Sequence, residues 1–160
     1  MLSIHIAKVR DMHVLVGIDG SSEADRAATY AATISSAMGG SVTIVHAVNP
    51  SVYDEGGPEP LSTLSERAQR LVIENIEHAE ERALEMLERT ARQLEAEDVE
   101  ISQEVLYGDP VSAIPEYAEA HGVDGIYVGH RGRSARAERY LGSVAKTIIE
   151  RASVPVTVVR

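Results

Sequence analysis

Three glycines and a serine near the C-terminal end of the chain form the most specific pattern in the sequence. Gly129, Gly132, Gly142 and Ser143 are spaced as G-x2-G-x9-G-S. Glycine permits positive φ values and a close approach of a ligand to the backbone, and the exposed N–H groups of such a loop can bind an anion. Gly142 and Ser143 also open a helical pattern, and the free N–H groups of a helix N-terminus favour phosphate. The pattern therefore predicts that a polyphosphate binds between the two ends of this loop, with a hydrogen bond from the Ser143 hydroxyl.

The spacing alone leaves a second interpretation open. It differs from a P-loop, which requires G-K-[ST], and from the dinucleotide pattern G-x-G-x-x-G. The same glycines would also suit a turn after a strand, an ordinary loop and a helix cap. Judged by spacing only, this structural interpretation is as good as the phosphate site.

A second glycine-containing turn follows an apolar segment near the N-terminus. Gly17, Ile18, Asp19 and Gly20 come after the first predicted strand, whereas the glycine loop comes after the fourth. Ligands of open α/β sheets bind at the carboxyl ends of the strands, near the point where the strand order reverses. If these two strands are neighbours, both turns open into one crevice. Asp19 is then either a ligand of the bound molecule or a cap for the first helix.

Strand and helix patterns alternate along the whole sequence. Short β-branched runs predict strands at 13–19, 41–48, 100–108, 124–129 and 155–159. Helical spacing fills the segments between them, with Ser21 and Ser22 as candidate caps of the first helix, Asp109 as cap of the third, and a long Glu-rich helix over about 64–97. That helix is expected to pack through a stripe that includes Leu71, Ala79, Ala83 and Leu87. The alternation predicts a single α/β domain, with an open parallel sheet and helices on both faces.

Composition restricts the class of protein further. The chain has 160 residues, 44% of them hydrophobic, a net charge of −10 and no cysteine. An acidic chain argues against nucleic acid as the main partner, and no apolar run approaches the length of a membrane span. The histidines have no metal-ligand spacing. We expect a cytoplasmic protein with a domain at 12–160 and an N-terminal extension at 1–11. Met12, the first residue of that domain, could itself be the start.

Several landmarks make the sequence resemble the UspA-like universal stress protein family from about residue 12 to residue 160. They are GIDGS after the first strand, VHAV in the second, GDP before the third helix, SVPVTVV at the end, and the glycine pattern G-x2-G-x9-G-[ST]. In that family the glycine pattern marks members that bind ATP. The resemblance implies a five-stranded parallel sheet in the order 3-2-1-4-5, the adenine nucleotide alpha hydrolase-like fold.

The resemblance also implies how ATP would lie. Asp19 would contact the ribose or the polar network around the metal, the backbone of Ala47 would meet the adenine, and Val128 would pack beneath the nucleotide. The sequence departs from many members at His130-Arg131 and at Gly17-Ile18, but neither departure removes a backbone donor. The complete predicted site consists of Gly17, Ile18, Asp19, Ala47, Val128, Gly129, His130, Arg131, Gly132, Gly142, Ser143 and Val144.

The function implied by the resemblance is that of an ATP-binding regulatory protein. It would bind ATP or another adenine nucleotide, with Mg²⁺ carried by the nucleotide, and form a homodimer through the edge strand that begins at Val154 and ends at Val159. We predict no catalytic residue, since no carboxylate base and no phosphate-binding lysine is evident, so hydrolysis would at most be slow. Two alternatives stay open: an ATPase or self-phosphorylating enzyme with Ser143 as acceptor, and an interaction module that binds no nucleotide.

Overall fold

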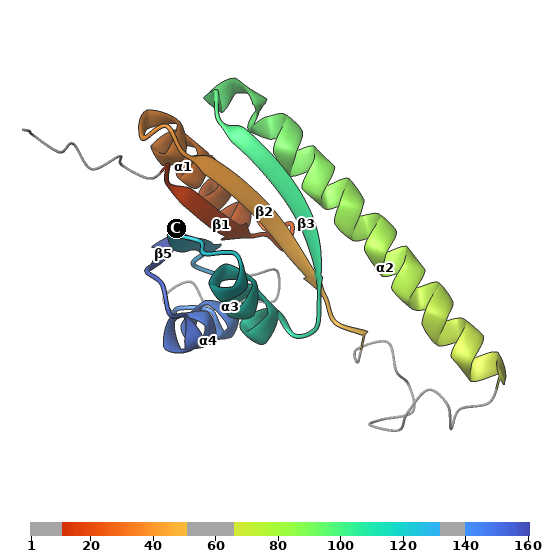
Figure 1. Ribbon diagram of the computed structural model, residues 1–160. Helices are drawn as coiled ribbons and strands as arrows, with labels where there is room; N and C mark the ends of the chain where they lie inside the picture. The colour runs from red at the N-terminus through yellow and green to blue at the C-terminus, as the bar shows by residue number, and fades with distance from the viewer. Residues whose placement is uncertain (1–10, 51–65, 132–139) are drawn as a thin grey trace, which may run out of the picture.

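The computed structural model describes residues 11–50, 66–131 and 140–160. The strands and helices alternate as expected (Figure 1). Their bounds are β1 His13–Gly17, α1 Ser22–Ala37, β2 Ser41–Val48, α2 Glu66–Gln93, the short 3-10 helix η3 Glu95–Glu97, β3 Glu100–Tyr107, α3 Pro110–Ala120, β4 Gly125–Gly129, α4 Ser143–Arg151 and β5 Val156–Val159.

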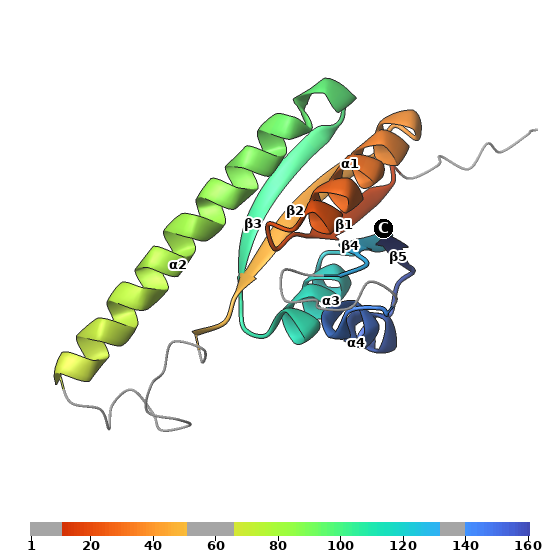
Figure 2. The same cartoon turned by 180° about the vertical axis from the view of Figure 1, so that it is seen from behind.

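The five strands form one parallel sheet in the order β3-β2-β1-β4-β5, which confirms the predicted architecture. Helices α1 and α2 pack on one face, and α3 and α4 pack on the other (Figures 1 and 2). The chain leaves β1 for β2 on one side and later returns to β4 on the other side. The order of strands therefore reverses between β1 and β4, where ligands of such sheets bind.

The side chains of β1 alternate between the two faces of the sheet. Val14 and Val16 pack in the layer of α1 and α2, whereas Leu15 packs in the layer of α3 and α4. All three are fully buried. Burying such side chains contributes roughly 1.5–3 kcal/mol each, so the central strand holds both layers in register. The carboxyl end of β1 is thus a fixed platform.

Helix α1 begins directly after the turn at Asp19. The Ser21 side chain accepts a hydrogen bond from the backbone N–H of Ala24 at 3.2 Å, so Ser21, and not the second candidate Ser22, is the N-cap. The backbone N–H of Ser21 in turn donates to Oδ1 of Asp19 at 3.0 Å. Gly20, between them, has a φ of +79°, which a glycine adopts without strain.

Helix α2 is confirmed in extent and only partly confirmed in its packing face. The predicted stripe residues Ala79, Ala83 and Leu87 are buried, but Leu71 is 51% exposed and Val72 is buried instead. Figures 1 and 2 show the N-terminal part of α2 extending beyond the ends of the strands. There is less sheet beneath that part of the helix, so the apolar spacing continues where the described residues leave Leu71 about half exposed. No helix in the described ranges combines the length and the apolar character needed to span a bilayer.

Candidate functional site

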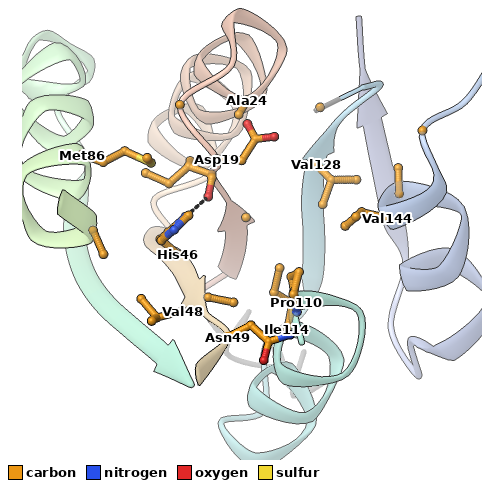
Figure 3. A pocket seen from close by; sticks show the side chains of 18 of the residues that line it. Asp19, Ala24, His46, Val48, Asn49, Met86, Pro110, Ile114, Val128 and Val144 are labelled. Atoms are coloured by element: carbon orange, nitrogen blue, oxygen red, sulfur yellow. Dashed lines mark hydrogen bonds between the residues drawn. The ribbon is translucent and has the colours of Figure 1, made fainter. Parts of the chain in front are cut away.

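A cavity of about 930 Å³ lies at the carboxyl ends of the central strands (Figure 3). It is bounded by the turn after β1, the end of β2, the end of β4, and by helices α2, α3 and α4. Its volume falls within the range typical of small-molecule sites. All but two of the predicted site residues line it, namely Gly17, Ile18, Asp19, Ala47, Val128, Gly129, Arg131, Gly142, Ser143 and Val144.

The two exceptions are His130 and Gly132. Gly132 lies outside the described residues. His130 is only 7% exposed and is not among the residues that line the cavity. Its Nδ1 atom lies 3.3 Å from Nε of Arg131, which donates to it. A contact between His130 and a phosphate therefore stays a prediction, while Arg131 lines the cavity itself.

The backbone of His130 connects three elements. Its N–H donates to the carbonyl oxygen of Val159 in β5 at 2.6 Å, and its carbonyl oxygen accepts from the N–H of Gly142 at 2.9 Å. Gly142 is the N-cap of α4. One residue thus joins the end of β4 both to the edge strand and to the start of the last helix.

Among the described glycines, the positive φ that glycine permits occurs at Gly20, Gly39, Gly108 and Gly122, and not at Gly129 or Gly142. Gly129 has no positive φ, and Gly142 has a φ of −61°. A Cβ at Gly129 would lie 2.8 Å from the backbone carbonyl carbon of Glu23 and 2.9 Å from the backbone nitrogen of Ala24. Gly129 is required because the first turn of α1 presses on it, whatever the cavity binds.

Three helices begin at this cavity, and their N-termini differ. In α3 the side chain of Asp109 caps the first turn. In α1 the Ser21 hydroxyl occupies the first turn, which also carries the carboxylates of Glu23 and Asp25. In α4 the N-cap is Gly142, with no side-chain hydrogen bond, and no acidic residue lies in the first turn. The free N–H groups and the dipole of α4 are therefore the ones that remain available to an anion.

The ionisation of Glu23 strengthens this difference. Hydrogen bonds from its own backbone N–H and from the Ser22 hydroxyl lower the pKa of Glu23 below 4.5, and the positive charges of Arg26 and Arg131 lower it further. Glu23 is thus negative at neutral pH. An anionic ligand is favoured at the α4 end of the cavity over the α1 end.

Hydrogen bonds fix the turn at the floor of the cavity. Asp19 uses Oδ1 to hold the N–H of Ser21, so it organises the entry to α1 as well as lining the cavity. His46 Nδ1 lies 2.7 Å from the carbonyl oxygen of Ile18, and the dashed line in Figure 3 marks this bond. His46 is therefore a hydrogen-bonded residue of the scaffold that also lines the cavity.

Sequence reasoning missed the contribution of α2. Arg82, Glu85, Met86 and Arg89 line the cavity, although the Glu-rich helix was expected to present only a solvated face beside its packed stripe. These residues recur at three- and four-residue steps, which places them on one side of the helix. That spacing is the available signal, but it does not tell which helix lies over the strand ends. Asn49, Pro110 and Ile114 were also missed.

The charged lining of the cavity is more basic than the protein as a whole. The chain has a net charge of −10, yet Arg82, Arg89 and Arg131 line the cavity against only Asp19 and Glu85. Within the described ranges no group of three or more histidine, aspartate or glutamate side chains could hold a metal ion. The excess of arginines in this lining favours an anion.

Comparison with known proteins gives one consistent result. The sequence model of the universal stress protein family matches residues 12–160. A universal stress protein of Thermus aquaticus is 33% identical over 150 residues, covering 92% of this chain and 97% of that protein. One of Mycobacterium tuberculosis is 29% identical over 160 residues, covering 96% of this chain and 50% of its own length. The chain thus spans about half the length of its mycobacterial relatives.

Solved structures share the same fold. The universal stress protein UspA of Lactobacillus plantarum superposes with a TM-score of 0.70 at 24% identity, covering 94% of this chain and 99% of that one. A universal stress protein in complex with cAMP superposes with a TM-score of 0.63 at 25% identity, covering 93% and 96%. An Archaeoglobus fulgidus protein in complex with dAMP gives a TM-score of 0.62 at 20% identity, covering 93% and 98%, which shows the fold alone.

Proposed function

Because the chain belongs to the universal stress protein family, we propose that its cavity binds ATP or another adenine nucleotide and that this binding is regulatory. The observation that carries the proposal is that the uncapped start of α4 and the turn at Gly129 open into one cavity at the reversal of strand order. Helix N-termini in this position bind phosphate groups. The relative in complex with cAMP supports an adenine nucleotide as ligand.

In this arrangement the phosphates lie at the N-terminus of α4. Backbone N–H groups of its first turn and the Ser143 hydroxyl donate to them, and the Arg131 guanidinium, which also lines the cavity, adds positive charge. The adenine then lies toward β2, beside the backbone of Ala47. Asp19, between these two regions, faces the ribose.

The residues present fit an Mg²⁺ ion that arrives with the nucleotide. Mg²⁺ commonly takes one or two carboxylates together with substrate phosphates and keeps several waters. Asp19 is the carboxylate of the β1 turn that lines the cavity, and one of its oxygens already holds Ser21. The ion would neutralise phosphate charge, while Asp19 and Ser143 would hold its water shell.

The regulatory step that we propose is a change in dimerisation. β5 is the edge of the sheet and lies next to β4 only, so an antiparallel partner strand from a second copy could extend the sheet. The backbone of His130 joins β5 to Gly142 at the phosphate end of the cavity. Nucleotide bound at α4 thereby biases the position of the edge strand. The cysteine-free sequence is compatible with action in the cytoplasm, which belongs to the same proposal.

A charge placed at the start of α4 tests the site. Ser143→Asp puts a carboxylate where the phosphates lie, although an acidic residue in this first turn favours the helix itself. We expect ATP affinity, measured by calorimetry, to fall at least tenfold with no loss of thermal stability. Thr147→Asp, one turn further along α4, adds the same charge outside the cavity lining and should retain most of the affinity.

The outcome that would overturn the proposal is equally direct. If the wild-type protein binds no adenine nucleotide by calorimetry, and mass spectrometry finds none released from denatured protein, the cavity has another ligand. Incubation with radiolabelled ATP separates the regulatory role from catalysis. Sustained release of phosphate would show an ATPase, and label retained on the protein would show self-phosphorylation.

A further inference from the structure

We propose that α2 forms the wall that receives the base of the nucleotide, with Met86 as its apolar contact and Arg82 and Arg89 on either side of it. This inference rests on the proposed function and extends it to residues that the glycine pattern does not include. It assigns the recognition of the base to a helix whose sequence shows only a charged surface. Three observations carry it: the reach of the side chains, the charges on α2, and the opposite position of the phosphate end.

The first observation is that α2 reaches the turn after β1. A Cβ at Gly20 would lie 3.2 Å from Cε of Met86 and 3.9 Å from Nη2 of Arg89, so both side chains extend over this turn. Figure 3 shows Met86 pointing from α2 toward Asp19. Nearer its N-terminus, α2 packs Ala79 and Ala83 against Val48 at the end of β2. The wall thus spans the ends of both β1 and β2.

The second observation concerns the arginines. Arg82 and Arg89 are seven residues apart, two turns of the helix or about 10 Å along its axis, and Met86 lies between them. Among the described residues neither forms an ion pair, whereas Arg92 on the same helix pairs with Glu88 at 3.5 Å. Two guanidinium groups beside the cavity are therefore available to a ligand.

The third observation decides which part of the nucleotide meets this wall. Val144 at the start of α4 and Met86 on α2 lie on opposite sides of the cavity (Figure 3). With the phosphates at α4, the base end of the ligand points toward α2.

The chemistry of these side chains suits a purine. A thioether makes favourable contacts with aromatic rings, and a planar guanidinium stacks on them. Alanines at 79 and 83 leave room beside Met86 for a flat ring system. The wall therefore binds the base by contacts with the faces and edges of the purine ring, and not by the charge of the arginines.

Methyl NMR tests the contact directly, because the chain has 4 methionines. Protein labelled with ¹³C at the methionine methyl groups is titrated with ATP, and the Met86 signal is assigned by its loss in Met86→Leu. We expect nuclear Overhauser effects from the adenine H2 or H8 proton to the Met86 methyl. Met12 and Met38 do not line the cavity and serve as internal controls.

Substitution of the arginines tests how they act. Arg82→Lys and Arg89→Lys keep the charge and remove the planar group, so together they should lower ATP affinity about threefold to tenfold and leave tripolyphosphate affinity unchanged. Arg92→Lys is the matched control on the same helix and should change neither. Three results would overturn this inference and leave the proposed function intact. ATP could bind without a contact between Met86 and the base, the double lysine variant could keep the wild-type ATP affinity, or it could lose as much affinity for tripolyphosphate as for ATP. A wild-type protein that binds no ATP would overturn the proposed function as well.

Discussion

His46 Nδ1 and the carbonyl oxygen of Ile18 are 2.7 Å apart, so a side chain of β2 fixes the backbone of the turn that follows β1. The backbone N–H of Ile18 also donates to the carbonyl oxygen of Val45 in β2 at 2.9 Å. Both polar groups of Ile18 are thereby satisfied from one neighbouring strand. This places Asp19, the next residue, at a defined position over the cavity.

The bond from His46 can be removed while its shape is approximately kept. His46→Leu leaves the Ile18 carbonyl without this partner and should cost about 1 kcal/mol of unfolding free energy. His46→Asn places an amide nitrogen close to the position of Nδ1 and should recover most of that loss. Urea denaturation of the three proteins measures both effects. Equal destabilisation by Leu and Asn would show that ring packing, and not the hydrogen bond, is what His46 contributes.

Gly129 is expected to tolerate no side chain. Gly129→Ala would bring Cβ within 3 Å of backbone atoms of Glu23 and Ala24, and backbone cannot rotate away as a side chain can. We expect a loss of roughly 1–3 kcal/mol, as for overpacked cores. Gly125→Ala in the same strand has its nearest such neighbour at 3.6 Å and should change stability by less than about 0.5 kcal/mol. Chemical denaturation compares the two, and equal stabilities would contradict the close approach of α1.

The N-cap of α1 gives a second stability test near the cavity. Ser21→Ala removes the acceptor for the Ala24 N–H and should cost about 1 kcal/mol. Ser22→Ala is the control, because among the described residues the Ser22 hydroxyl bonds to the Glu23 side chain and to no backbone N–H of the helix. Thermal unfolding distinguishes them. A smaller effect at Ser21 than at Ser22 would reassign the cap.

Tyr107 predicts a dependence of stability on alkaline pH. Its hydroxyl donates to Oε1 of Glu80 at 2.7 Å, and this bond, with a smaller contribution from burial and from the Glu80 charge, raises the pKa of Tyr107 above 10.0. The folded protein keeps the phenol proton where the unfolded chain has lost it. The stabilisation is therefore complete below pH 10 and is lost as the pH rises through the folded-state pKa.

The measurement uses Tyr107→Phe. Because Tyr107 is 57% exposed, the substitution should cost only a few tenths of a kcal/mol near neutral pH. The difference from wild type should shrink toward zero above the folded-state pKa. Tyr140→Phe, at a residue that is 75% exposed, should make no difference at either pH. Urea titrations on both sides of the transition provide the values, and a constant difference would exclude the Glu80 bond.

The proposed dimer can be tested at the outer edge of β5. The carbonyl groups of Pro155 and Val159 accept from β4, so the alternating residues 156 and 158 direct their backbone groups outward. Val158→Pro removes an outward N–H and should shift the protein toward monomer in sedimentation velocity. Val158→Ala loses side-chain volume but keeps the donor and should remain dimeric. Identical sedimentation of both variants and wild type would argue against pairing through this edge.

Local signals explain why much of the fold could be predicted. Ser21, Ser22 and Asp109 could be named as cap candidates because their side-chain oxygens can accept from the N–H groups of the next turn, and in the structure Ser21 and Asp109 do so. The β-branched runs located every strand to within two residues at either end. The order of the strands depends on contacts between distant segments and came from the family resemblance.

The site was predicted less completely, and for a physical reason. Residues at or just after the ends of strands, such as Ala47 and Asp19, can be placed at the cavity because the carboxyl ends of parallel strands share one edge. Arg82, Met86 and Arg89 contribute through the packing of α2 across that edge, and their spacing is the same as on any exposed helix face. The rotation of α2 about its axis is set by tertiary packing, as the exposed Leu71 also illustrates.

The contact between Gly129 and the start of α1 bears on how the glycine signature is interpreted in other sequences. The first glycine of the signature is required by the packing of the fold, since any chain that packs a helix this tightly onto the fourth strand needs a glycine there. A search that selects for the full spacing will therefore also retrieve proteins that have kept the scaffold and lost the ligand. Proteins that bind the ligand are better distinguished from those that do not by positions that line the cavity and make no such packing contact.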